Sequence, residues 1–326
     1  MFGKAVNAAR LSVLLLRAGM GALALGLALG STGLVWPGAG SAVGDTVLWQ
    51  IRLPRSLAAW LAGALLGLAG AIAQGLFRNP LADPFLLGSA SGAALGVALA
   101  LVAMGSTAAS VLWLANLGLT GGAFVGALLG VGLTIALARG TAHTLRLLLG
   151  GVVVGVVLGA VTSLVGNRNP QILSAMQGFN LGTTAFVSLS SCATMAAVLL
   201  PSTVLAFSWA KGLDALALGQ DTALSLGLPL ARINTAMVLL LALCTGTSVA
   251  QTGLIAFVGL AAPHMVRALG IANHRSLLVL SALAGGLLLC LADALARAAT
   301  APEELPVGVV TAVVGGGYLM LRLHKK

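Results

Sequence analysis

The chain has 326 residues, of which 59% are hydrophobic and only 7% charged, and its mean hydropathy is +1.07. Such a chain has too few polar residues to cover the surface of a soluble protein. The composition therefore excludes an ordinary soluble protein and indicates a membrane protein. The net charge of +10 would suggest nucleic-acid binding in a soluble protein. Here the positions of the charges, between apolar runs, explain it better, and no nucleic-acid partner is expected.

Apolar runs near the ~20 residues that a helix needs to cross a hydrocarbon core recur along the whole chain. They predict an all-α, polytopic membrane protein with about ten transmembrane helices in a single domain, 1–326. The first run follows Lys4 and Arg10 but is longer than a usual signal core, so we take it as the first helix. The expected spans are 11–33, 55–77, 86–105, 115–138, 146–166, 188–208, 233–250, 254–269, 277–297 and 305–323.

The basic residues divide unequally between the two sides of the predicted bundle. With both termini in the cytoplasm, thirteen of the 17 Lys and Arg fall on the cytoplasmic side, and Arg52, Arg55, Arg168 and Arg297 fall outside. Such a bias fixes the orientation and an even number of spans. The cytoplasmic group is Lys4, Arg10, Arg17, Arg78, Arg139, Arg146, Lys211, Arg232, Arg267, Arg275, Arg322, Lys325 and Lys326.

Small residues and one faint repeat carry the remaining structural signal. Glycines recur at four-residue spacing at 118, 122, 126 and 130 and again at 151, 155 and 159, which predicts close helix packing. The three cysteines, Cys192, Cys244 and Cys290, lie in apolar spans without metal-ligand spacing, so we expect buried thiols and no disulfide. Residues 73–84 resemble residues 250–263, which hints at two weakly related five-helix halves.

Motifs for catalysis are missing from the sequence. Glutamate occurs only at 303 and 304, no His-Glu-x-x-His is present, and no P-loop exists. The chain is therefore expected to be no enzyme by itself. An ion-coupled carrier is the alternative class, with Asp83, Asp293 or His264 as the titrating group, although Asp293 lies four residues before Arg297 and predicts an ordinary helical ion pair.

An ordered set of motifs resembles one known family, the FecCD-type permease subunits of ABC importers for iron chelates, haem and cobalamin. The resemblance runs from about residue 48 to the C-terminus, and the ordered set is specific where each motif alone is weak. The motifs are QIRLPR (50–55), QGLFRNPLADP (74–84), LGSASG (87–92), LALG (216–219), LGLP (226–229), FVGL (257–260), PH (263–264) and ELPVG (304–308).

This resemblance implies an assembly in a bacterial inner membrane. A second copy of the chain, two cytoplasmic ATPase subunits and a periplasmic substrate-binding protein are the expected partners besides membrane lipid. ATP and Mg would be bound by the ATPases, and no cofactor or metal by this chain. Arg52, Arg55 and Arg297 are expected to receive acidic residues of the binding protein, since guanidinium suits bidentate pairing with carboxylates. Headgroup anchoring is the alternative.

The resemblance also assigns a gate and a coupling element on the cytoplasmic side. Asn79 and Leu81 would form the gate with Thr144 and Leu145, where Leu145 replaces the small polar residue of the cobalamin permease; a plain turn, forced by two prolines, is the alternative. Residues 212–231 predict two short amphipathic helices parted by Gly219, inserted into the ATPase; an inert loop is the alternative. The coupling residues are Leu218, Gly219, Gln220, Asp221, Leu226 and Gly227.

The substrate pathway is expected near residues 166–182, where the family places a short helix in the outer vestibule. Arg168 would meet an anionic cargo, and the wall would be formed by Met176, Gln177, Phe179 and Asn180. We therefore expect haem first, then a ferric siderophore, then cobalamin, whose periphery is mostly neutral amides. A plain interface anchor is the alternative for Arg168.

Overall fold

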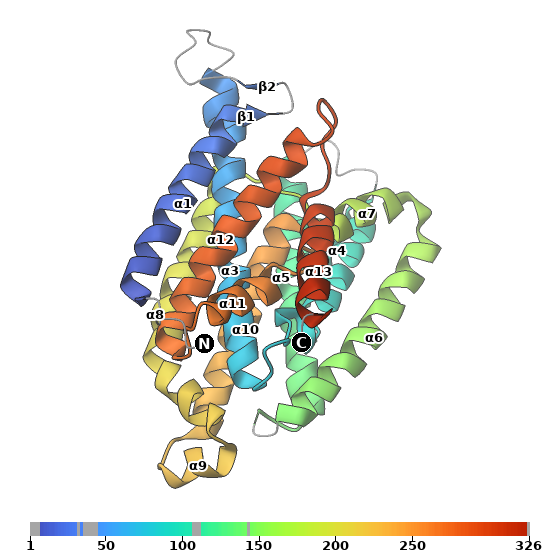
Figure 1. Ribbon diagram of the computed structural model, residues 1–326. Helices are drawn as coiled ribbons and strands as arrows, with labels where there is room; N and C mark the ends of the chain where they lie inside the picture. Colours follow the sequence, from blue (N-terminus) through green and yellow to red (C-terminus); the bar gives the residue numbers. More distant parts are fainter. Residues whose placement is uncertain (1–6, 31–32, 35–44, 106–111, 142–143, 325–326) are drawn as a thin grey trace.

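The computed structural model describes residues 7–30, 33–34, 45–105, 112–141 and 144–324, and Figure 1 shows them as one bundle of helices. Lys4, Lys325 and Lys326, counted above, lie outside this part. The helices of the first half are α1 (Ala8–Ala28), α3 (Leu53–Leu76), α4 (Ser89–Met104), α5 (Leu112–Leu137) and α6 (Thr144–Arg168). Those of the second half are α7 (Leu173–Leu181), α8 (Leu189–Ala217), α9 (Gln220–Ser225), α10 (Leu230–Thr252), α11 (Val258–Ala268), α12 (His274–Ala298) and α13 (Val307–His324).

Short irregular elements join these helices. A π-helix, η1 (Val47–Arg52), leads into α3, and 3-10 turns η2 (Pro84–Leu87) and η4 (Pro170–Ile172) precede α4 and α7. Two-residue strands β1 (Leu29–Gly30) and β2 (Gly33–Leu34) pair antiparallel after α1. They lie at the opposite end of the bundle from α9 (Figure 1). We call these two ends the β end and the α9 end.

The ten predicted spans all correspond to helices of the structure, which confirms the fold class. Seven helices of the described part are long and apolar enough to cross a membrane, and α4 and α13 are shorter apolar helices. The prediction for 254–269 needs correction. Only α11, with 11 residues, is helical there, and its length of about 16 Å is half of what a crossing needs.

The return segment between α10 and α11 runs through the bundle without helical structure. Leu254 N donates to the carbonyl of Phe179, and Thr183 N donates to that of Thr252, so α7 satisfies this extended backbone. Ile255 in the same segment is fully buried. Irregular backbone at membrane depth is tolerated where other protein segments satisfy its polar groups, as these do.

Helix α3 occupies the centre of the bundle and packs against α8, α10, α11 and α12. Small residues bring α3 and α12 together at backbone distance. A Cβ atom at Gly67 would lie 2.1 Å from the carbonyl oxygen of Ser281, and one at Gly63 would lie 2.3 Å from that of Gly285. Side chains larger than hydrogen would force the two backbones apart.

The first glycine row packs as predicted, and the second does so only in part. Gly122, Gly126 and Gly130 on α5 face the backbone of Gly88, Gly92 and Gly96, at and within the start of α4. On α6, Gly151 contacts the carbonyl of Leu86, but nothing lies within 4 Å of a Cβ placed at Gly159. The outer half of the second row therefore faces away from the rest of the chain.

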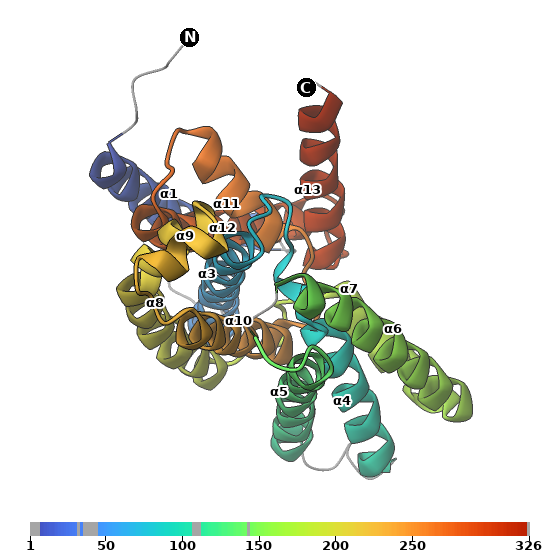
Figure 2. The ribbon, with the colours of Figure 1, turned by 90° about the horizontal axis from the view of Figure 1, so that it is seen from below.

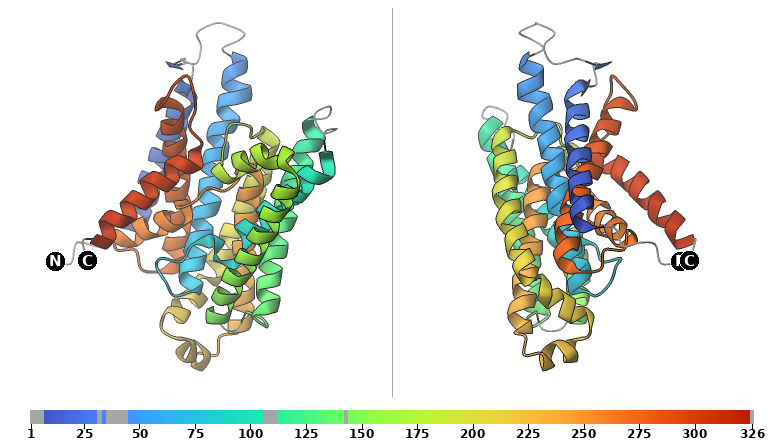
Figure 3. Two further views of the ribbon diagram at one scale, coloured as in Figure 1. Left: turned by 90° about the vertical axis from the view of Figure 1, so that its right-hand side faces the viewer. Right: turned by 60° about the vertical axis from the view of Figure 1, so that its left-hand side comes forward.

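Helices α6 and α13 stand apart from the central bundle, as the view from the α9 end and the side views show (Figures 2 and 3). Both carry long rows of exposed apolar side chains, with Val156 69% exposed on α6 and Val313 70% exposed on α13. Such large apolar faces are expected to meet lipid or another protein chain.

The basic residues separate between the two ends as predicted. Within the described residues, seven members of the group predicted to be cytoplasmic lie at or near helix termini at the α9 end, and Arg17 lies within α1. The residues at these termini are Arg78, Arg139, Arg146, Lys211, Arg232, Arg267 and Arg275. Which side of the membrane this end faces stays a prediction.

Candidate docking, gate and coupling sites

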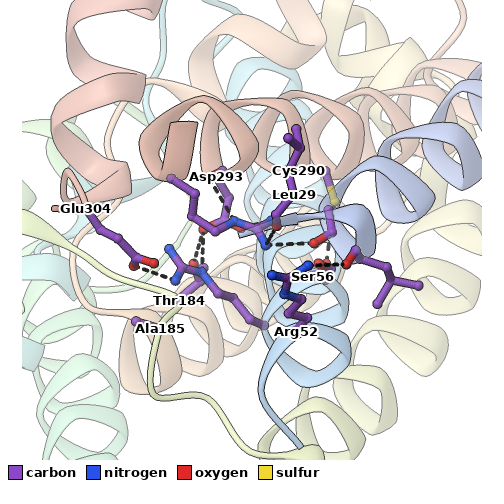
Figure 4. A network of polar contacts seen from close by, with 12 residues as sticks. Leu29, Arg52, Ser56, Thr184, Ala185, Cys290, Asp293 and Glu304 are labelled. Carbon is purple, nitrogen blue, oxygen red and sulfur yellow. Dashed lines mark hydrogen bonds and ion pairs between the residues drawn. The ribbon is translucent and has the colours of Figure 1, made fainter. Parts of the chain in front are cut away.

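Three arginines, Arg52, Arg55 and Arg297, lie close to the carboxylates of Asp293 and Glu304 at the β end, and two of them, Arg55 and Arg297, form ion pairs there; Figure 4 shows this arginine network. Asp293, on α12, is fully buried. Its carboxylate forms ion pairs with Arg55 (Nε–Oδ1 3.1 Å) and with Arg297 (Nη2–Oδ2 2.7 Å), and its Oδ1 accepts from the Thr184 hydroxyl at 2.6 Å. The predicted ion pair between Asp293 and Arg297 is confirmed.

The same network fastens α1 and the loop before α13 to the bundle. Arg55 Nη1 lies 2.6 Å from Glu304 Oε2. Arg52 Nη1 donates to the carbonyls of Leu27 and Ala28 at 3.0 and 2.9 Å. Arg297 Nη1 donates to the carbonyls of Gly26 and Leu29 at 2.7 and 3.0 Å. Five separate segments thus converge on three guanidinium groups.

Arg52, Arg55 and Arg297, which are expected to receive acidic residues of a binding protein, already have partners within the chain. All three are buried, with exposures of 4%, 7% and 2%. Their physical role in this conformation is internal, because a buried cation must be paired. Docking of a binding protein through them stays a prediction.

The predicted gate residues lie at the α9 end, in the turn after α3 and at the start of α6. Asn79 Oδ1 accepts from the backbone N–H of Leu81 at 2.9 Å, which fixes the turn after α3. Asn79 and Leu81 are exposed, and on α6 Thr144 is half-buried and Leu145 is 70% exposed. The structure therefore leaves Asn79, Leu81 and Leu145 open to solvent, and their gating role stays a prediction.

Asp83, a candidate titrating group, has a structural role in the same turn. Its carboxylate caps η2 by accepting from the Phe85 N–H at 2.8 Å. Burial raises the pKa of this carboxyl, and the Phe85 hydrogen bond opposes the rise. Asp83 is therefore a cap of the turn that carries the gate residues.

The predicted coupling segment contains one separate helix rather than two. Helix α8 continues to Ala217, so the first expected helix is its last turn, in which Leu213 and Leu216 are buried. Gly219 and Gly227 have φ angles of 119° and 73° and bound α9, as predicted. Leu218 and Leu226 are 70% and 62% exposed, and Gln220 and Asp221 begin α9. Residues 218–227, which we call the coupling tip after their predicted role, lie beyond the rest of the bundle (Figure 1).

The predicted vestibule residues divide between two faces of α7. Met176 is buried with Val97 and Val249, so it packs in the core and does not form a wall, which corrects the prediction. Phe179 is half-buried against the same cluster. Gln177 and Asn180 are exposed, and so is Arg168 at the end of α6.

One cluster at the α9 end was missed by the sequence analysis. Asp214, near the end of α8, accepts from the backbone N–H of His274 at 2.9 Å and lies 2.6 Å from its Nδ1. Beside this pair is a cavity of about 260 Å³. The pair links residues 60 positions apart, and no local pattern signals such a contact. The cavity is lined by Gln74, Gly75, Arg78, Asn79, Pro80, Ala217, Arg267 and His274.

The features above define a class of protein: a polytopic α-helical membrane protein with an interrupted helical crossing between α10 and α11 and an exposed short helix, α9, at one end. The sequence profile of the FecCD transport family matches residues 13–325. This chain therefore belongs to the FecCD transport family.

Individual proteins agree with that membership. The chain is 40% identical over 287 residues to the vitamin B12 import system permease protein BtuC of Salmonella paratyphi A, covering 87% of this chain and 86% of the relative. It is 39% identical over the same length to the BtuC protein of Salmonella typhi. A solved metal-chelate type ABC transporter in an inward-facing conformation matches with a TM-score of 0.87 and 27% identity, over 97% of this chain and 99% of the other.

Proposed function

We propose that this chain is the permease subunit of an ATP-driven importer whose cargo is a corrinoid of the vitamin B12 class. Two copies would form the pathway, with two ATPase subunits at the α9 end and a substrate-binding protein at the β end of a bacterial inner membrane. Both termini would be cytoplasmic. The observation that carries the proposal is the 40% identity to vitamin B12 import permeases over 87% of the chain.

The cargo differs from the haem that Arg168 suggested, and the exposed face of α7 supports the change. Its solvent-facing side chains include Ser174, Gln177 and Asn180, all neutral hydrogen-bonding groups. A corrinoid periphery rich in amides pairs well with such groups, because each amide both donates and accepts. Haem is the second candidate, favoured by the exposed Arg168, whose guanidinium suits propionates.

A second copy of the chain is proposed to cover the exposed apolar faces of α6 and α13. These faces include the exposed side chains of Val152, Val156 and Val313. At Gly159, on the same helix as the first two, no atom lies within 4 Å of the position that a Cβ would take. Two such faces brought together would bury apolar area and frame a pathway along their contact.

An ion-coupled carrier is less well supported. Asp293 has Arg55 and Arg297 as partners and is fully buried, so its carboxylate is held in a structural ion pair. Asp83 caps a turn, and His264 makes an edge-to-face contact with Tyr318 at a centroid distance of 6.0 Å. Each of the three therefore has a structural contact that accounts for it without a proton relay.

The test is transport by the reconstituted complex. Proteoliposomes containing the permease, its ATPase and its binding protein should take up cyanocobalamin only with ATP at the ATPase, independent of proton and sodium gradients. Haem is measured in parallel. Uptake of haem without cyanocobalamin would overturn the cargo, and uptake driven by an ion gradient without ATP would overturn the class.

Paired variants then separate the two cargoes. Combined Gln177→Ala and Asn180→Ala should reduce corrinoid uptake by about tenfold, since each lost pairing leaves polar cargo groups without a partner. Arg168→Ala should leave corrinoid uptake close to that of the wild type. The opposite pattern would assign an anionic cargo.

A further inference from the structure

The cavity beside His274 has the composition of an anion site. It is bounded by the ends of α3, α8 and α11 and the start of α12. Two of its lining side chains, Arg78 and Arg267, are cations, and no carboxylate lines it in the part of the chain that the structure describes. Asp214 lies behind the imidazole, on its Nδ1 side.

Three polar atoms of the lining residues have no hydrogen-bond partner within the described structure. They are Nε2 of His274, Nε of Arg267 and Oε1 of Gln74. His274 and Gln74 are almost completely buried, at 3% and 2% exposure. A buried polar group left unpaired costs free energy, so three of them around one cavity indicate a missing partner.

The rest of each side chain is fixed, which orients the unpaired atoms. His274 is held by Asp214 at Nδ1, and Gln74 Nε2 donates to the carbonyl of Leu260 at 3.3 Å. Gly75 leaves room for the imidazole, because a Cβ there would lie 2.9 Å from Nε2. Preorganised groups of this kind lose little entropy when a ligand binds.

We infer that this cavity, the α9-end pocket, binds one anionic group of the carboxylate or phosphate class. Its oxygens would accept from Arg267 Nε–H and from the Arg78 guanidinium, and Nε2 of a neutral His274, whose Nδ1–H faces Asp214, would accept from a P–OH group or a water. A P–OH group or a water beside a carboxylate would donate to Gln74 Oε1. At about 260 Å³ the pocket has room for such a group and several waters, each of which occupies ~30 Å³ in the liquid.

Two sources can supply this anion. One is free phosphate from the solution at the α9 end. The other is an acidic side chain of the ATPase, because Ala217 in the pocket wall is the last residue of α8 before the coupling tip. The second source rests on the proposed function, and the first does not.

The first experiment measures free phosphate. Thermal unfolding of the purified permease in lipid nanodiscs is followed with added phosphate against chloride at equal ionic strength. Phosphate also stabilises proteins non-specifically, so the comparison is between variants. Wild type and Arg232→Gln, an exposed arginine outside the pocket at the same end, should respond equally. Arg78→Gln and Arg267→Gln should show a smaller shift.

The second experiment measures binding of the purified ATPase to the same nanodiscs. If the anion is an acidic side chain of the ATPase, Arg78→Gln and Arg267→Gln should weaken binding by about tenfold, and Arg232→Gln should not. Arg78 is exposed, so its substitution leaves the core intact, and unchanged wild-type elution on gel filtration checks each variant.

The outcomes are distinct. A phosphate shift that depends on Arg78 and Arg267 supports the pocket with a free anion, and weaker ATPase binding without that shift supports it with an acidic side chain. If neither measurement distinguishes these variants from Arg232→Gln, the proposal is overturned. Absence of ATPase binding by the wild type would sink the proposed function alone, because the phosphate experiment still decides the pocket.

Discussion

Two clusters of charged residues lie at opposite ends of α3 and α12, and they differ in whether their arginines are paired with a carboxylate. In the arginine network at the β end, Arg55 and Arg297 share the buried carboxylate of Asp293. In the α9-end pocket, Arg78 and Arg267 line a cavity to which the described residues contribute no carboxylate, and buried polar atoms there have no hydrogen-bond partner among those residues. The first cluster is closed upon itself and the second is open.

This difference follows from how costly a buried charge is. A guanidinium in a low-dielectric interior is tolerated only when a carboxylate and carbonyls replace its water. The arginine network meets that requirement with the carbonyls at the end of α1 and the carboxylate of Glu304, so it holds these segments against the bundle. In the α9-end pocket Arg78 is exposed and needs no carboxylate, but the buried atoms of His274, Arg267 and Gln74 that have no hydrogen-bond partner in the described structure suit the pocket to an external partner.

The largest effect is expected from Asp293→Ala, which would break the closed cluster. Arg55 and Arg297 would lose their common buried carboxylate, at a cost of about 3–5 kcal/mol in unfolding free energy. Thermal unfolding of the purified permease should show a large fall in melting temperature, together with poor yield. Asp293→Asn, which still accepts from Thr184, should lose less unfolding free energy. Equal stability of wild type and Asp293→Ala would show that the arginine network does not hold these segments together.

A smaller effect is expected at the coupling tip beside the open cluster. Gly219→Val places a β-branched side chain at φ 119°, a conformation that costs about 1–3 kcal/mol for residues other than glycine. The tip should change its orientation, so ATP hydrolysis by the assembled complex should continue while cargo uptake falls. Gly21→Val is the control, since nothing lies within 4 Å of a Cβ there. Tight coupling in Gly219→Val would contradict the assignment.

Asp214→Asn tests the support behind the α9-end pocket. The variant keeps a hydrogen-bonding side chain but removes the charge that faces His274 Nδ1, and Asp214 is 40% exposed at its side chain. We expect a loss of about 1 kcal/mol in unfolding free energy, discounted for solvent screening. Thermal unfolding measures it, and a loss as large as that of Asp293→Ala would show that the two clusters do not differ.

The smallest effect is expected from Glu304→Gln. Glu304 is 29% exposed at its side chain, and Arg55 keeps Asp293 as a partner, so the loss should stay below about 1 kcal/mol. Raising the salt concentration should reduce the difference between wild type and variant further, which thermal unfolding in both buffers would detect. A salt-independent loss would place Glu304 inside the closed cluster.

The positions of the helices were predictable because hydrophobic length is a local property. Nine of the ten apolar runs became helices and the tenth, 254–269, contains only the short α11, while the breaks at Gly219 and Gly227 fell where the turn residues indicated. The half-length of α11 was not predictable, since the extended return segment is as apolar as a helix. Its backbone is satisfied by Phe179 and Thr183, which lie some 70 residues away in sequence.

The sequence by itself therefore determined the class of protein, the number of apolar segments and the division of charge between the two ends. Each follows from composition and order along the chain, which decide what lipid will accept. Only the tertiary structure decided that Arg52, Arg55 and Arg297 are buried, that Met176 packs in the core, and that Asp214 meets His274. Burial and pairing depend on contacts between distant segments, and these exist only when the helices have packed.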